Sequence, residues 1–148
     1  MGYRSNVGIA TTKEVYDKLI KEAPEDTKEL LKMCDEYYIS KYQPTIYDRE
    51  NTNFIPNGPE ETIIILRWHW IKRYAEDYAC IEKFIRENEG CIAWVGESFD
   101  NVGYECYGES DIPWYEYLEI RSDIISNLQD GSYTANYTEF LERLEKCN

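Results

Sequence analysis

The sequence predicts an α+β fold, in which a mostly antiparallel sheet carries helices packed on one face, as a single domain over residues 1–148. Two observations lead to this fold class. Apolar residues recur at helical spacing in four segments and alternate in several others, and the strand-like segments concentrate late in the chain. A chain of this length buries about 68–70% of its unfolded surface, which is enough for a core. No repeat or linker divides it.

A strand and a helix are predicted first. Val7 and Ile9 alternate with small or polar residues over residues 3–10, which predicts a strand whose apolar face carries the odd positions. Thr11 and Glu14 have the spacing of a capping box, in which each side chain accepts a hydrogen bond from a backbone N–H of the first helical turn. We therefore expect the first helix to begin at Thr11.

Pro24 is expected to separate two helices, because proline ends a helix but is tolerated at the first position of the next. The second helix is predicted to run toward Tyr37. Residues 40–59 have no helical period and end in the turn-forming cluster Pro56–Pro59. They predict a long excursion or a ragged hairpin.

Residues 62–70 give the strongest strand prediction, since β-branched side chains suit a pleated surface. Ile63 and Ile65 face one way, whereas Ile64 and Trp68 face the other, so both faces are expected to be covered. Trp70 is predicted to share the face of Trp68 by the same alternation.

The second half of the chain predicts one helix, a set of strands and a final helix. Asn136 and Glu139 have capping-box spacing ahead of an apolar run, which indicates where the final helix begins. The other predicted elements are a helix from Asp77 to Asn88 and strands at Cys91–Val95, Tyr104–Tyr107 and Tyr115–Arg121, with a turn around Gly108 and Pro113 between the last two.

Cysteine usage and hydropathy predict a cytoplasmic protein. The five cysteines form no Cys-x-x-Cys pair and leave an odd thiol, which favours a reducing compartment over a disulfide framework. The most apolar run, Ile63–Leu66, is far shorter than the ~20 residues of a membrane helix. No amino-terminal targeting segment is evident, so neither a membrane location nor secretion is expected.

The negative charge is polarised along the chain. The net charge is −13, and residues 75–148 contribute −12 of it, with 17 acidic and 5 basic side chains. Between Arg86 and Arg121 lies a stretch with no lysine or arginine, here called the acidic segment. Its nine carboxylates are Glu87, Glu89, Glu97, Asp100, Glu105, Glu109, Asp111, Glu116 and Glu119. Such a segment repels nucleic acid and anionic membranes and attracts a basic protein surface.

Four interpretations of the acidic segment compete. A calcium loop could use the oxygens of residues 97–101, but the alternating Asp/Asn pattern with a glycine and a terminal glutamate is missing. A glycosidase could use paired carboxylates in an aromatic cleft. A contact surface would combine carboxylates with aromatic anchors. A solvated face that only aids solubility is the simplest of the four.

Other catalytic and cofactor signals are weak. His69 is the only histidine, and no serine or cysteine nucleophile is marked beside it, so a hydrogen-bonded structural role is favoured. No glycine-rich phosphate-binding motif occurs, and the cysteines are too widely spaced to indicate zinc. No cofactor and no metal is predicted.

Two short segments resemble small, mostly uncharacterised accessory proteins of phages and prophages of Gram-positive bacteria. They are Met1-Gly2-Tyr3-Arg4-Ser5-Asn6-Val7 and Trp94-Val95-Gly96-Glu97-Ser98-Phe99-Asp100-Asn101. The resemblance implies a phage accessory context, where small acidic proteins act as inhibitors of host defence, anti-CRISPR proteins among them. It implies no catalytic residue.

The predicted function is therefore binding, by an acidic protein that occludes the basic surface of a host defence nuclease or another nucleic-acid-binding protein. No direct contact with nucleic acid or membrane is predicted, and the sequence is compatible with a dimer. The alternative is a small hydrolase that acts on a nucleotide or glycan with paired carboxylates and possible help from His69. The predicted partner-binding residues are Glu97, Asp100, Glu105, Glu109 and Asp111 for charge, with Phe99, Tyr104, Tyr107 and Trp114 as anchors.

Overall fold

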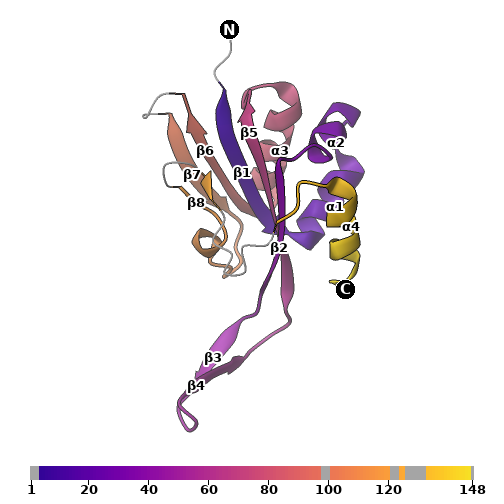
Figure 1. Cartoon of the computed structure of the whole chain (residues 1–148). Coiled ribbons are helices and arrows are strands. Elements are labelled where there is room, and N and C mark those ends of the chain that lie inside the picture. The colour runs from indigo at the N-terminus through magenta and orange to yellow at the C-terminus, as the bar shows by residue number, and fades with distance from the viewer. Residues whose placement is uncertain (1–3, 98–100, 121–123, 126–132, 148) are drawn as a thin grey trace.

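A computed structural model shows an α+β fold built on one five-stranded antiparallel sheet (Figure 1). It describes residues 4–97, 101–120, 124–125 and 133–147. In spatial order the strands are β2 (Glu36–Tyr42), β5 (Glu61–Ile71), β1 (Ser5–Thr12), β6 (Gly90–Gly96) and β7 (Val102–Tyr107). The predicted fold class is confirmed.

Figure 1 shows the helices together on one side of this sheet, as predicted. They are α1 (Lys13–Glu22), α2 (Glu25–Leu31), α3 (Glu76–Glu87) and α4 (Tyr137–Glu145). Each contributes apolar side chains to a core shared with Val7, Ile9 and Trp68 of the sheet. The predicted helix at residues 77–88 and the Asn136 cap are both confirmed, since the Asn136 side chain accepts from the backbone N–H of Glu139 at 2.9 Å.

The opposite face of the sheet is covered by residues 112–120 instead of by a helix layer. This segment contains the 3₁₀ turn η1 (Trp114–Glu116) and β8 (Glu119–Ile120), which pairs with β9 (Ile124–Ile125). It buries Ile112, Trp114 and Leu118 against Ile63 and Ile65. The predicted strand at residues 115–121 is therefore wrong over most of its length. Pro113, which fixes its own φ, precedes a tight turn that hydropathy alone did not reveal.

The junction of the first strand and helix differs by one residue from the prediction. β1 continues to Thr12, and it is the Thr12 hydroxyl that accepts from the backbone N–H of Val15, at 3.2 Å. Thr11 is a buried strand residue, and its hydroxyl donates to the carbonyl of Glu89 at 2.6 Å. The predicted cap at Thr11 is therefore wrong by one residue, because β1 stays paired with β5 as far as Thr12 and the helix begins only after it.

The second helix is much shorter than predicted, since α2 ends at Leu31 and residues 36–42 form the edge strand β2. The Tyr37 hydroxyl explains the stop, because it donates to the carbonyl of Leu31 at 2.9 Å and accepts from the N–H of Cys34 at 3.1 Å. These bonds use groups that a longer helix would pair internally. Tyr37 and Tyr38 then point to opposite faces of the sheet, as in a strand buried on both sides.

β5 confirms the prediction of a strand covered on both faces, with Ile63, Ile64 and Trp68 at most 1% exposed. Alternation fails at its end. Trp70 has a φ of 61°, in the left-handed region, and its side chain is 49% exposed instead of sharing the core with Trp68. Two hydrogen bonds hold this conformation: the Trp70 N–H donates to Oδ1 of Asn6 at 2.9 Å, and Nη1 of Arg4 donates to the Trp70 carbonyl at 3.2 Å.

Of the two alternatives predicted for residues 40–59, the structure shows the hairpin: β3 (Thr45–Asp48) and β4 (Asn53–Pro56) form a two-stranded ribbon that projects away from the sheet (Figure 1). Residues 40–42, which the prediction included, belong to β2. Residues 44–59 are called the arm below. Asp48 fixes its turn by accepting from the backbone N–H groups of Glu50 and Asn51 and from the Asn51 amide. The Asn51 side chain contributes most to lowering the pKa of this carboxyl.

Among the described residues, no helix is both long and apolar enough to cross a membrane.

Candidate functional site

Carboxylates of the acidic segment lie at the surface of the loop that joins β7 to η1. Glu109 and Asp111 are exposed in this loop and Glu116 is exposed in η1, and no lysine or arginine among the described residues pairs with them. Their charge therefore faces solvent without a nearby countercharge in the described part of the chain. The predicted residues Phe99 and Asp100 lie outside the described residues, as does most of the calcium-loop candidate.

Glu105 and Tyr107 are engaged within the protein. Both lie on the α3 side of β7, where Arg86 Nη2 is 3.4 Å from Glu105 Oε1 and Arg86 Nε donates to the Tyr107 hydroxyl at 3.2 Å. The hydrogen bonds that Arg86 donates to Tyr107 and Glu105 raise the pKa of its guanidinium, and the bond to Tyr107 is the larger cause. A partner that binds Glu105 would have to compete with Arg86. Glu105 and Tyr107 are consequently less available to a partner than the exposed carboxylates Glu109 and Asp111.

Two predicted anchors belong to the core. Trp114 is 5% exposed and packs edge-on to Tyr117, with the ring centroids 6.4 Å apart. Tyr104 packs against the same core, and burial raises the pKa of its hydroxyl. In the 3₁₀ turn, residues three apart share a face, so Trp114 and Tyr117 point inward and Tyr115 points out, 65% exposed. The exposed aromatic is thus Tyr115, the neighbour of the predicted anchor Trp114.

Glu97 lies apart from this loop, at the other end of the sheet. Its Oε1 accepts from the backbone N–H of Arg4 at 3.0 Å. The exposed ring of Trp70 belongs to the same end, since Arg4 also bonds to the Trp70 carbonyl. A bulky residue in the left-handed region costs about 1–3 kcal/mol and persists where its surroundings fix it, often at functional positions. Trp70 is a surface feature that residue spacing alone did not reveal.

A cavity of ≈ 190 Å³ lies where the arm joins the sheet. Two carboxylates, Glu61 and Asp111, line it beside apolar groups. Asp111 was a predicted partner-binding residue, whereas the sequence analysis did not select Glu61. The full lining comprises Tyr42, Pro44, Pro59, Glu61, Ser110, Asp111 and Ile112. Below it is called the arm-base pocket.

The electrostatics around the arm-base pocket favour a cation. Partial burial of the carboxyl, together with the negative charges of Glu89 and Glu14, raises the pKa of Glu61. Glu89 is tied to the pocket loop because its carboxylate accepts from the Ser110 hydroxyl. A positive group placed here would relieve the repulsion among these carboxylates.

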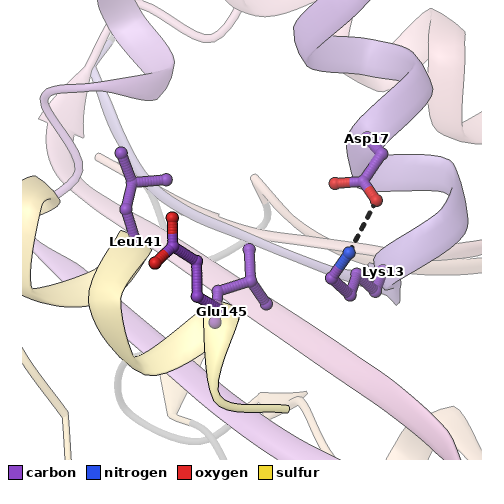
Figure 2. A pocket seen from close by; sticks show the side chains of 5 residues that line it. Lys13, Asp17, Leu141 and Glu145 are labelled. Atoms are coloured by element: carbon purple, nitrogen blue, oxygen red, sulfur yellow. Dashed lines mark hydrogen bonds and ion pairs between the residues drawn. The ribbon is translucent and has the colours of Figure 1, made fainter. Parts of the chain in front are cut away.

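A second hollow of ≈ 210 Å³ lies between α1 and α4 (Figure 2). Figure 2 shows Lys13 and Asp17 on α1 facing Leu141 and Glu145 on α4. Lys13 Nζ is 2.8 Å from Asp17 Oδ2, so the carboxylate on the α1 side already has a countercharge. This hollow is the weaker candidate for binding a cationic group.

The structure gives little support to a catalytic role for His69 or to a metal site. His69 Nε2 lies 2.7 Å from Glu36 Oε2, and its backbone N–H donates to Asp35 Oδ2 at 2.7 Å, which agrees with a hydrogen-bonded structural histidine. In the described ranges, no group of three or more His, Cys, Asp and Glu side chains could hold a metal ion.

Comparisons of the chain with protein-family models, with curated proteins and with solved structures find no significant match. A function is therefore inferred from the residues and geometry above. The resemblance to phage accessory proteins stays a prediction.

Proposed function

We propose that this protein works by binding, and that it covers a basic surface on another protein through the loop 108–116 and the adjoining arm-base pocket. One observation carries the proposal. Exposed carboxylates with no cationic partner among the described residues lie beside a hollow in which Glu61 and Asp111 sit among apolar walls. That combination suits a lysine or arginine side chain, whose methylene stem needs apolar contact and whose charged end needs oxygen acceptors.

The partner class follows from the charge. Surfaces that bind nucleic acid are lined with lysine and arginine, and a carboxylate surface competes with phosphates for those cations. The net charge of −13 argues against direct binding of nucleic acid by this chain. We propose a nucleic-acid-binding protein as the partner. The resemblance in residues 1–7 and 94–101 supports the narrower proposal that it is a host defence nuclease.

The size of the arm-base pocket weighs against the hydrolase alternative. Pockets that hold small-molecule ligands usually measure about 300–1,000 Å³, and this hollow measures ≈ 190 Å³. Three aromatic side chains of the acidic segment that could form a sugar cleft are engaged elsewhere in the described part of the chain. Trp114 and Tyr104 pack in the core, and the ring of Trp94 lies under the guanidinium of Arg73, 3.5 Å from its Cζ. The hollow matches one cationic side chain better than a sugar or a nucleotide.

Reversing two exposed charges tests the binding surface. We expect Glu109→Lys with Asp111→Lys to fold normally, because surface substitutions usually change stability by no more than ~0.5 kcal/mol each. The double variant should lose the partner that the wild-type protein captures from a host lysate. The measurement is affinity capture with mass spectrometry, followed by DNA binding of the captured partner with and without this protein.

The matched control is Glu22→Lys with Glu142→Lys, which makes the same change in net charge at exposed positions of α1 and α4. This variant should capture the partner nearly as well as wild type, and capture by wild type should weaken at high salt. Equal loss in both variants would mean that only net charge matters, and full retention by the loop variant would refute the proposed surface.

Partner binding should depend on pH through Glu61. Its pKa is raised, so lowering the pH from neutrality protonates this carboxyl before an ordinary glutamate, and each protonation removes an acceptor for the cation. The affinity for the partner should therefore decrease as the pH is lowered. Glu61→Gln should bind more weakly at neutral pH and show a flatter dependence, measured by titration calorimetry. If the affinities of the wild-type protein and of Glu61→Gln depended on pH in the same way, Glu61 would be excluded from the contact.

A further inference from the structure

Two cysteines lie opposite each other at the edge of the sheet. Cys91 of β6 pairs directly with Cys106 of β7 in the register of the two strands. Directly paired residues of an antiparallel ladder point to the same face, so both side chains lie on the face opposite the helices. Cys91 is buried there, whereas Cys106 is exposed on the edge strand. One thiol of the pair is therefore accessible to solutes, and the other is shielded from them.

The hydrogen bonds between β6 and β7 place this pair where the strands approach closely. The Gly96 N–H donates to the carbonyl of Asn101 at 2.7 Å, which marks those two residues as a hydrogen-bonded pair. Hydrogen-bonded and non-hydrogen-bonded pairs alternate along an antiparallel ladder. Cys91 lies an odd number of positions from Gly96 in a regular register, so it forms a non-hydrogen-bonded pair with Cys106. The Cα atoms of such a pair are about 4.5 Å apart, and a disulfide joins Cα atoms that are about 4.4–6.8 Å apart.

The electrostatics agree with this proximity. Burial raises the pKa of the Cys91 thiol, and the neighbouring Cys106 adds to the rise. Tyr104 lies two residues before Cys106, on the same face of β7, and the pKa of its hydroxyl is raised by burial and further by both thiols. Cys91 is therefore protonated at neutral pH, and the exposed Cys106 is the thiol that meets a reagent from solution first.

We propose that Cys91 and Cys106 form a modification site, which low-molecular-weight disulfides convert into a cross-strand disulfide. The thiolate of Cys106 attacks one sulfur of the reagent, which forms a mixed disulfide on Cys106 and releases one reagent thiolate. Cys91 then loses its proton and attacks the Cys106 sulfur, which forms the bond between the two cysteines and releases the second reagent thiolate. The two protons lost by the cysteines pass to the released thiolates. The reagent is thus reduced by two electrons, and the cysteine pair is oxidised by two.

The disulfide has a structural consequence at the edge of the sheet. It ties β7 to β6 and closes the segment 91–106 into a loop, which restricts the unfolded chain and so stabilises the fold. In the reducing compartment predicted from the sequence, the pair stays as thiols and a disulfide of this kind is transient. The exchange uses none of the carboxylates of the loop 108–116, so this inference does not depend on the proposed function.

Peptide mapping of the intact protein tests this proposal. Trypsin cleaves after lysine and arginine, so Cys91 and Cys106 fall in one peptide, residues 87–121, which contains no other cysteine. The native protein is incubated with oxidised glutathione, and the remaining thiols are then alkylated in urea. The peptide should carry no alkyl group and no glutathione, and it should be lighter than the reduced, unalkylated peptide by two hydrogen atoms. Dithiothreitol should restore both thiols.

Three variants separate the two steps of the exchange. Cys91→Ala should stop the reaction at the mixed disulfide, so the peptide keeps one glutathione on Cys106. Cys106→Ser should leave Cys91 reduced, because the exposed thiol is missing. Cys80→Ser is the matched control, since it removes a partly exposed cysteine of α3 and should leave closure unchanged. Circular dichroism establishes that each variant is folded.

Thermal unfolding gives a second readout that does not need the buried Cys91→Ala variant. Wild-type protein treated with oxidised glutathione should melt at a higher temperature than the reduced protein, and Cys106→Ser should not show this shift. An equal shift in Cys106→Ser would assign the stabilisation to another cysteine and overturn the proposal. A wild-type peptide that stays reduced, or that keeps glutathione on Cys106 without closing, would also overturn it.

Discussion

Trp68→Ala should lower the free energy of unfolding by about 3–5 kcal/mol, the usual cost of emptying a buried aromatic site. Trp68 is 1% exposed and packs edge-on to Tyr78, with ring centroids 5.4 Å apart. Its indole N–H also donates to the carbonyl of Leu30 at 3.0 Å, so truncation leaves a cavity and an acceptor without its donor. Urea unfolding followed by circular dichroism measures the loss.

Trp70→Ala is the matched control. It removes a second tryptophan side chain, two residues along the same strand, and this one is 49% exposed. It should change the free energy of unfolding by no more than ~0.5 kcal/mol. A cost similar to that of Trp68→Ala would mean that the ring of Trp70 packs against the protein. A Trp68→Ala variant that melts like wild type would contradict the burial of Trp68 between the sheet and the helices.

The fold could be predicted where one pattern dominated. Ile63 and Ile64 lie on opposite faces of β5 and are both buried, and the continuous apolar run on that strand indicated this directly. The prediction failed where a tertiary contact decided the outcome. The Tyr37 hydroxyl helps to end α2 by donating a hydrogen bond to the carbonyl of Leu31. The spacing of apolar residues cannot predict this bond, because it depends on a side chain six positions further along the chain.

The candidate site was predictable in its charge and not in its geometry. Clustered carboxylates indicated an acidic surface, and the structure leaves Glu109 and Asp111 exposed in one loop. The sequence did not indicate that Glu61, some fifty residues earlier, shares a pocket with Asp111, because that proximity depends on how the arm leaves the sheet. Nor did it separate Glu105, which faces Arg86, from carboxylates with no such neighbour.

Glu82→Gln should also lower the free energy of unfolding by about 3–5 kcal/mol, because it leaves a buried guanidinium without its countercharge. Arg73 and Glu82 have side chains only 7% and 5% exposed, and the pair is bidentate: Nε donates at 2.8 Å and Nη2 at 2.9 Å. Arg86 adds a third donor at 3.2 Å. Glutamine keeps the size of the side chain but offers one carbonyl oxygen to three charged donors. Urea unfolding at neutral pH measures the effect.

Glu105→Gln is the matched comparison, since Glu105 contacts the same Arg86 from a position where both side chains are 39% exposed. Exposed ion pairs contribute at most about 1 kcal/mol, so this variant should remain close to wild type. Replacing the buried pair together, as Arg73→Met with Glu82→Leu, should recover much of the lost stability, because no charge is then left in the interior. If Glu82→Gln and Glu105→Gln cost the same, the Arg73 pair would have to be hydrated, and Arg73, which lies over the Trp94 ring, would belong to the accessible surface.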